Sequence, residues 1–155
     1  MLGYHLEHIF SYTARLAAPP EVIGPVPGGI RINFYVQEGE ATGPQIRGKV
    51  RPVGGDWFTL RPDGVGLLDV RATIETDDGA LIDVAYRGMI DLGSDAYDRF
   101  LRGQPLSSGP GQLRTQPRFL SSAPAYAWLN RLFCLGIGLN DPEKGELLYD
   151  VYAVR

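Results

Sequence analysis

Apolar and polar residues alternate along most of this chain, and glycine, proline and aspartate interrupt the alternation at short intervals. The clearest example is the run 51–86, RPVGGDWFTLRPDGVGLLDVRATIETDDGALIDVAY, in which three apolar-rich segments are joined by Gly-Gly-Asp, Arg-Pro-Asp-Gly and Asp-Asp-Gly. Glycine in such junctions supplies the positive φ that tight hairpins need. The run therefore predicts an antiparallel meander.

The same pattern predicts strands at about residues 4–15, 30–37, 45–51, 56–61, 66–76, 80–89, 112–120, 131–139 and 146–154. The segment 18–29, APPEVIGPVPGG, is predicted to be a loop, because proline cannot donate to a strand ladder. One short helix is predicted, with Ser94 as its N-cap and Gly103 as its end, and a helical turn is predicted near Ala125–Leu129. The stretch 103–111 is predicted to be a loop over one end of the sheet.

Eight or nine short antiparallel strands with little helix indicate either a sandwich or a closed barrel. Closure removes the exposed sheet edges, and successive hairpin links favour an up-and-down order. We therefore predict an all-β fold, a closed antiparallel up-and-down β-barrel that forms one domain over residues 1–155. A barrel of about eight strands is either filled by side chains or holds one small ligand.

The composition of the chain excludes several classes of binding partner. A chain of 155 residues can bury a core without help from a metal or a disulfide. The net charge of −3, with no basic patch, argues against a nucleic-acid partner, and no apolar stretch is long enough to span a membrane. The N-terminus has no basic region before an apolar core, and Cys134 is the only cysteine, so a cytoplasmic protein is expected.

The first candidate chemistry is the pair Asp69 and Arg71, which share one face of a predicted strand because side chains alternate with period two. Alternation cannot tell whether this face points into the barrel or out to solvent. If it points inward, the guanidinium of Arg71 suits a carboxylate or enolate oxygen, and Asp69 is a candidate base. The alternative is a structural salt bridge in the barrel wall.

Several other residues have two interpretations each. Asp56 either caps the Gly-Gly turn or contacts a ligand. Trp57 and Trp128 are either core or the aromatic walls of a pocket. Tyr86 either donates a hydrogen bond to a carbonyl or lies at a wet barrel rim.

Metal and cofactor chemistry find no support in the sequence. His5 and His8 fall on opposite faces of a strand, so they cannot chelate one metal together, and no other Cys or His cluster exists. No nucleotide-binding fingerprint and no nucleophile elbow occurs. We therefore expect no metal and no cofactor, and the apolar setting of Cys134 indicates a structural thiol.

The chain resembles a widespread bacterial family of uncharacterised proteins, known only as a domain of unknown function. The resemblance is carried by LEHIFSYTARL, PGGIR, GPQIRGKVRPVGGDWFTLRPDGVGLLDVRATIETDDGALIDV, LRTQPRFLSSAPAYAWLNRLFCLGIG and the terminal YDVYAVR. It implies a small closed β-barrel reminiscent of the allene-oxide-cyclase barrel, and homo-oligomers, dimeric or higher. The motif positions it carries over are Arg31, Asp56, Asp69, Arg71, Asp78, Gly79, Arg114, Pro117, Tyr126, Trp128 and Asn130.

The resemblance brings no activity with it, although barrels of the cyclase and lipocalin kind bind apolar small molecules in their mouths. Our leading hypothesis is a cofactor-independent lyase, isomerase or cyclase that acts on a small apolar or aromatic molecule bearing an oxygen. Its candidate catalytic residues are Asp69, Arg71 and Tyr86, and its candidate ligand-binding residues are Arg31, Tyr35, Asp56, Trp57, Arg114, Trp128 and Asn130.

Two alternatives stay open, a non-catalytic barrel that binds a small hydrophobic ligand and a structural barrel that builds an oligomer. The catalytic hypothesis requires that Asp69 and Arg71 face an enclosed hollow rather than solvent.

Overall fold

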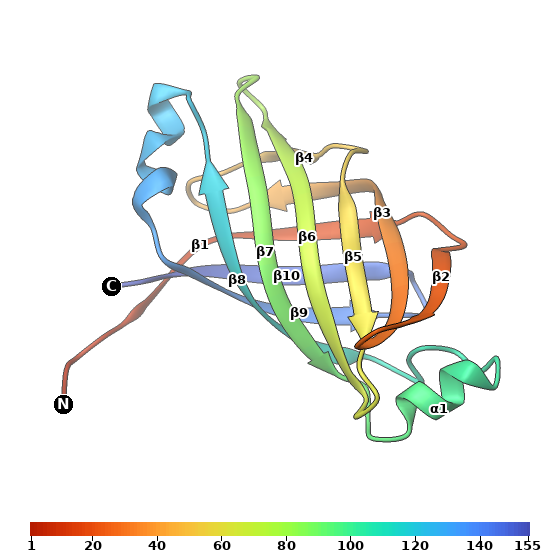
Figure 1. The fold of residues 1–155 in the computed structure, drawn as a ribbon. Coiled ribbons are helices and arrows are strands. Elements are labelled where there is room, and N and C mark those ends of the chain that lie inside the picture. The colour runs from red at the N-terminus through yellow and green to blue at the C-terminus, as the bar shows by residue number, and fades with distance from the viewer.

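The computed structural model describes all residues, 1–155, and shows a barrel of antiparallel strands with two short helical segments outside its wall (Figure 1). The strands are β1 Leu6–Leu16, β2 Glu21–Val26, β3 Gly29–Thr42, β4 Gly48–Val50, β5 Gly55–Leu60, β6 Val65–Thr76, β7 Leu81–Asp91, β8 Gly111–Leu120, β9 Cys134–Asp141 and β10 Glu146–Val154. The helical segments are α1 Ala96–Leu101 and the 3₁₀ helix η1 Pro124–Arg131. No helix in the protein is long and apolar enough to cross a bilayer.

The sheet closes on itself. Neighbouring strands follow the order β1-β10-β9-β8-β7-β6, and β1 pairs with β3 on its other side. Between β3 and β6 the short strands β4 and β5 lie one after the other and share a single place in the wall. The predicted closed up-and-down barrel is therefore confirmed, with eight places in the wall and two extra strands.

One strand lies where we predicted a loop. Residues Glu21–Val26 form β2 although they include Pro25, so the prediction of a loop over 18–29 is wrong at this point. β2 pairs only with β3 and is an edge strand. A proline is tolerated there, because the outer side of an edge strand needs no N–H donor.

The helical predictions need smaller corrections. Asp95, not Ser94, precedes the first residue of α1, and the Asp95 carboxylate forms an ion pair with Arg99 at 3.1 Å instead of capping the helix. Gly103, with φ of +79°, lies just after α1 as predicted. The predicted turn near 125–129 is the longer η1, so the following strand begins at Cys134 rather than at 131.

The two ends of the barrel differ. At the end beside η1, Leu129 is fully buried and Phe10 packs edge-on against Phe119 with ring centroids 5.4 Å apart. Buried apolar side chains from β1, β8 and η1 fill the barrel at this end. At the opposite end, α1 and the loop that follows it extend past the strands (Figure 1).

Thr115 on β8 lies opposite a glycine on each neighbouring strand, Gly88 on β7 and Gly136 on β9. A Cβ at Gly136 would lie 2.2 Å from Oγ1 of Thr115, and a Cβ at Gly88 would lie 2.5 Å from Cγ2 of the same side chain. Thr115 is buried between β7 and β9 and fits only because both neighbours lack a side chain.

Candidate active site around Asp56

Asp69 and Arg71 lie on the outer face of the barrel. On β6 they alternate with Leu68 and Val70, which fill the interior. The side chains of Asp69 and Arg71 are 41% and 51% exposed, and Nη1 of Arg71 lies 3.0 Å from Oδ1 of Asp69. The enclosed hollow that the catalytic hypothesis required of this pair is absent, and the arrangement is that of a solvent-exposed salt bridge.

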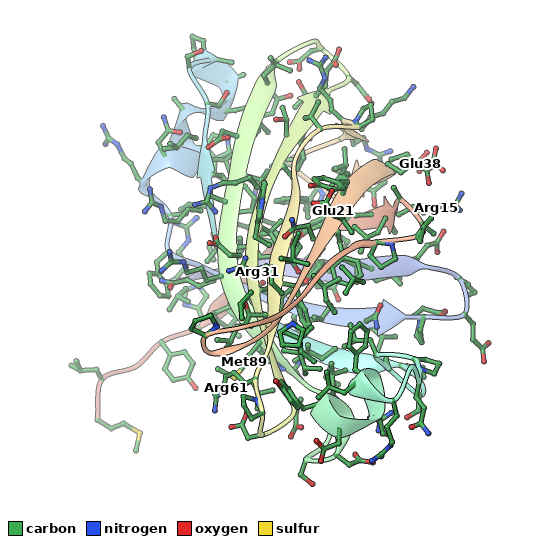
Figure 2. All side chains as sticks on the ribbon, turned by 45° about the vertical axis from the view of Figure 1, so that its right-hand side comes forward. Arg15, Glu21, Arg31, Glu38, Arg61 and Met89 are labelled. Atoms are coloured by element: carbon green, nitrogen blue, oxygen red, sulfur yellow. The ribbon has the colours of Figure 1, made fainter.

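Three candidate ligand-binding residues also lie on the outer side of the wall. The Arg31 guanidinium donates to the backbone oxygen of Trp57 at 2.7 Å, and the Tyr35 hydroxyl donates to Oε1 of Glu21 on β2 at 3.1 Å. Figure 2 labels Arg31 and Glu21 on this side of the molecule. Trp57 and Tyr35 are both exposed.

The remaining ligand-binding candidates hold local structure together. Arg114 faces outward and donates to the backbone oxygen of Leu113 at 2.8 Å. In η1, the indole N–H of Trp128 donates to the Ala125 oxygen at 3.0 Å. Asn130 makes two hydrogen bonds with the backbone of Ser121, at 2.8 and 2.9 Å, and so ties η1 to the end of β8.

Asp56 points the other way, into the barrel. It is the second residue of β5 and pairs with Phe34 on β3 and Val70 on β6, so its side chain shares their inward face. Gly54, with φ of +80°, precedes it in the turn. The residue is only 9% exposed, which makes Asp56 a carboxyl group held inside an apolar core.

Burial changes the chemistry of this carboxyl. Desolvation raises the pKa of Asp56 to about 7, the backbone N–H of Asp69 opposes the rise, and the Asp69 charge adds to it. The N–H of Asp69 donates to Oδ1 of Asp56 at 2.9 Å. A carboxyl with a pKa near neutrality can both accept and release a proton at physiological pH.

A pocket of about 320 Å³ opens at the end of the barrel near α1 and reaches Asp56. We call it the mouth pocket. It is lined by Leu16, Ala17, Ala18, Pro20, Phe34, Asp56, Phe58, Leu68, Ile90, Leu92, Pro105, Leu106, Ser107, Leu113, Asn140, Pro142, Gly145 and Leu147. Asp56 is the only ionisable residue among them, and the predicted loop over 103–111 contributes Pro105–Ser107 to its wall.

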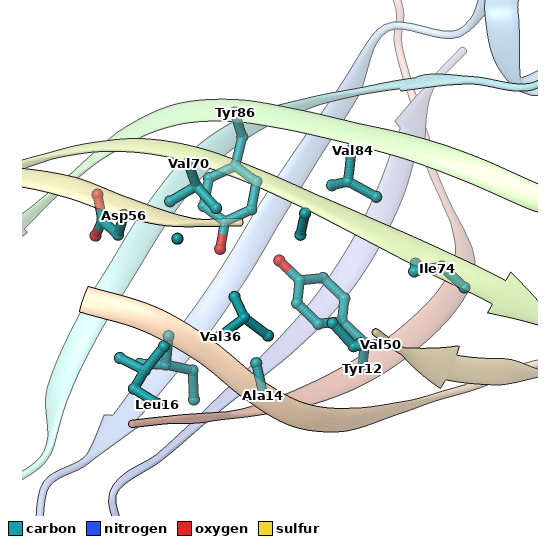
Figure 3. Close-up of a pocket in the computed structure, with 13 residues that line it drawn as sticks. Tyr12, Ala14, Leu16, Val36, Val50, Asp56, Val70, Ile74, Val84 and Tyr86 are labelled. Carbon is teal, nitrogen blue, oxygen red and sulfur yellow. The ribbon is translucent and has the colours of Figure 1, made fainter. Parts of the chain in front are cut away.

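A second, much smaller cavity of about 20 Å³ touches Asp56 from deeper in the barrel. We call it the inner cavity. Tyr12 and Tyr86 line it, and in Figure 3 their hydroxyl oxygens point toward one another across it, with Asp56 at its edge. Tyr86 is thus the one candidate catalytic residue that faces inward, and burial raises its pKa to about 12.

Tyr12 and Tyr149 are not among the site residues predicted from the sequence. They face each other across the β1–β10 pairing, their rings stack at 4.9 Å, and Tyr149 lies 5.6 Å from the ring of Tyr86. Burial raises the pKa of both phenols well above the usual value. In both strands the tyrosine is a buried position between two more exposed neighbours, which is the signal that the sequence offered. The contact between the two rings could not be predicted, because it forms only when the barrel closes.

Other reactive groups lie apart from this site. Cys134 is buried, and desolvation raises the pKa of its thiol to about 11, which leaves it protonated at neutral pH. No three His, Cys, Asp or Glu side chains come close enough together to hold a metal ion.

The sequence matches the model of the family described as Protein of unknown function (DUF3237) over residues 4–154. A UPF0311 protein of Bradyrhizobium diazoefficiens is 32% identical over 125 residues, which are 79% of this chain and 80% of that protein. A second UPF0311 protein, from Rhodopseudomonas palustris, is 29% identical over 148 residues, 96% of this chain and 95% of the relative.

Solved structures share the barrel. The crystal structure of a conserved protein of unknown function from Rhodopseudomonas palustris has a TM-score of 0.86 at 27% identity, with 100% of both chains covered. A beta-barrel like protein from Acinetobacter baumannii has a TM-score of 0.84 at 24% identity, covering 100% of this chain and 98% of the other. A structure described as an enzyme from Penicillium herquei has a TM-score of 0.70 at 21% identity, covering 100% of this chain and 97% of that one.

Proposed function

This chain belongs to the DUF3237 family, and because that family is described as of unknown function, we propose an activity from the chain's own pocket. It is a cofactor-independent lyase, isomerase or cyclase that uses Asp56 as its acid–base residue. The observation that carries the proposal is the position of Asp56, the one ionisable side chain that lines the apolar mouth pocket. Perturbed carboxyl groups in clefts are typical of functional sites.

The lining of the mouth pocket favours a neutral substrate. No lysine, arginine or histidine lines it, so nothing there would offset the charge of an anionic ligand beside Asp56. Aliphatic and aromatic walls suit a small apolar or ring-containing molecule, and Ser107 and Asn140 supply polar contacts. A ketone or phenol of two or three fused rings fits this description.

The proposed reaction moves one proton. The Asp56 carboxylate takes a proton from a carbon next to a carbonyl, the electron pair of the C–H bond passes into an enolate, and the resulting carboxyl group returns the proton at another carbon. Atoms and charge balance without a metal or a nucleotide. The low polarity of the pocket walls strengthens the interaction between Asp56 and the reacting atoms. The Penicillium herquei barrel, which is called an enzyme, supports the idea that this fold can carry catalysis.

A non-catalytic binding barrel is the second candidate. It is favoured by the same apolar lining, since a carrier of a hydrophobic molecule needs the pocket but no proton transfer. We also propose a cytoplasmic location, which the single buried Cys134 supports. We further propose a homo-oligomer, which the exposed apolar side chains of Met89, Leu139 and Leu148 on the outer face support.

The test uses α-tetralone, a neutral two-ring ketone with an exchangeable C–H bond. In D₂O near neutral pD, the protein is expected to raise the rate of deuterium incorporation, followed by mass spectrometry, about tenfold or more over buffer. Asp56→Asn should abolish the acceleration, and Asp69→Asn, which alters an exposed carboxylate, should retain it. Binding of β-naphthol, read by its fluorescence, without exchange on any neutral ketone would favour the carrier.

A further inference from the structure

We propose that the inner cavity binds one water molecule, which connects the carboxyl group of Asp56 to the hydroxyls of Tyr12 and Tyr86. Tyr12 and Tyr86 are then positioning residues for the proposed acid–base group. Their effect on catalysis rests on the proposed function, whereas the water site itself does not.

The geometry of the cavity defines the site. Tyr12 comes from β1, Tyr86 from β7 and Asp56 from β5, and the three line the same small space (Figure 3). The rest of the lining is mostly aliphatic, with Val36, Val70 and Val84 among it, so Asp56, Tyr12 and Tyr86 carry the polar side-chain groups that border this space.

The size of the cavity fits a single water. A buried water needs roughly 10–15 Å³ of such space and two to four polar partners. The inner cavity has about 20 Å³. The volume requirement is therefore met, and the carboxyl of Asp56 and the hydroxyls of Tyr12 and Tyr86 are the partners that the proposal assigns to the water. The same space is too small for any organic ligand.

Such a water would serve Asp56 in both of its protonation states. Oδ1 of Asp56 already accepts the N–H of Asp69, which leaves one oxygen without a protein donor. When the carboxyl is ionised, the water donates to it and accepts from a tyrosine hydroxyl. When the carboxyl is protonated, the water accepts its proton in a hydrogen bond and donates to a tyrosine oxygen, because hydroxyl groups can rotate. The water only forms hydrogen bonds with Asp56 and does not take its proton away. In the proposed reaction, Asp56 therefore exchanges its proton with the substrate in the mouth pocket.

Tyr149 supplies a matched control. Its ring stacks on Tyr12 and lies 5.6 Å from the ring of Tyr86, but the residue does not line the inner cavity. The other charged groups that act on Asp56 are Asp69 on β6 and Arg31 on β3. Tyr12→Phe, Tyr86→Phe and Tyr149→Phe leave both of these in place and remove one hydroxyl each.

The experiment has two readouts, both on the protein without ligand. The first is a high-resolution crystal structure of the unchanged protein, in which we expect density for one water at hydrogen-bonding distance, about 2.6–3.2 Å, from Asp56 and from a tyrosine hydroxyl. The second is the pKa of Asp56, followed by ¹³C NMR of its carboxyl carbon. Tyr12→Phe and Tyr86→Phe should each raise this pKa by about half a unit or more, because the water that donates to the ionised carboxyl loses one of its own partners. Tyr149→Phe should change this pKa by less than either of them, because it removes no group that lines the inner cavity.

A dry inner cavity would overturn the proposal even if the variants fail to fold. So would equal pKa values in all folded variants, or a shift in Tyr149→Phe as large as that in Tyr12→Phe, since both would reduce the tyrosines to packing. Neither readout depends on turnover. A protein with an ordered water here and no exchange of α-tetralone would disprove the proposed reaction and leave this inference intact.

Discussion

The backbone N–H of Asp69 donates a hydrogen bond to Oδ1 of Asp56, 2.9 Å away, from the strand next to it. The ladder between β5 and β6 pairs Asp56 with Val70 and Thr59 with Leu67, but it is interrupted between these pairs. The Asp56 carboxyl therefore satisfies a backbone donor that the ladder leaves free. Asp69 thus contacts the buried site through its backbone, while its own carboxylate lies in solvent on the other face.

The raised pKa of Asp56 predicts that the protein loses stability as pH rises. The pKa is about 7 in the folded state against 3.8 for the ordinary carboxyl, so the folded protein holds a proton that the unfolded chain releases between these values. This contribution is fully present below pH 3.8 and is lost as pH rises through 7. Between pH 5 and pH 8 the free energy of unfolding should fall by roughly 2–3 kcal/mol from this group.

Urea unfolding at the two pH values measures this loss, and Asp56→Asn should remove it, because an amide does not titrate. The amide oxygen of that variant can still accept the N–H of Asp69, so the fold should persist. Asp69→Asn is the control. It keeps the buried carboxyl and the backbone N–H but removes a charge that adds to the raised pKa of Asp56, so it should keep most of the pH dependence of the unchanged protein. A slope that survives in Asp56→Asn would assign the titration to another group.

Breaking the outer salt bridge should matter little. Replacing Asp69 by Asn or Arg71 by Met removes a pair whose side chains are about half exposed. Exposed ion pairs contribute little, so the free energy of unfolding should change by no more than about 1 kcal/mol. Binding of β-naphthol, titrated by fluorescence, should be unaltered. A loss of binding in either variant would show that the outer face takes part in the site.

Narrowing the mouth pocket should weaken binding. Ala17 lines the pocket, so Ala17→Trp places a large ring in the path to Asp56. The affinity for β-naphthol should fall about tenfold or more, a loss of about 1.4 kcal/mol. Ala125→Trp, on the exposed surface of η1 at the closed end, adds the same ring and should bind normally. Equal affinities in the two variants would place the ligand elsewhere.

Filling the space beside Thr115 should destabilise the barrel. In Gly136→Ala the new methyl group would lie 2.2 Å from Oγ1 of Thr115, and overpacking of this kind costs about 1–3 kcal/mol. Thr115→Ala removes that oxygen, so the double variant should lose less stability than the sum of the two single changes. Guanidinium unfolding of the four proteins gives the coupling energy. If the two losses of unfolding free energy simply add, then a clash with Thr115 is not the reason why position 136 requires glycine.

Hydrophobic alternation was sufficient to predict the barrel, because each strand carries its apolar face in its own residues. It could not assign the polar face of β6. Alternation places Leu68 and Asp69 on opposite faces of the strand, but only the closed barrel shows which face points to the interior. The same limit hid the contact of Tyr12 with Tyr149, whose strands pair across the seam between the first and the last strand of the barrel. Asp56 was identified as a ligand candidate, but its burial depends on the three-dimensional position of β5 between β3 and β6.

Phe10 and Phe119 fill the barrel at the end beside η1, and the mouth pocket opens at the opposite end. In the proposed reaction, substrate would enter and product would leave through the mouth pocket, past Leu106. Under the proposed function, the loop residues Pro105–Ser107 at that rim would therefore select the ligand and limit its release, while β5 holds the carboxyl of Asp56 in the barrel wall.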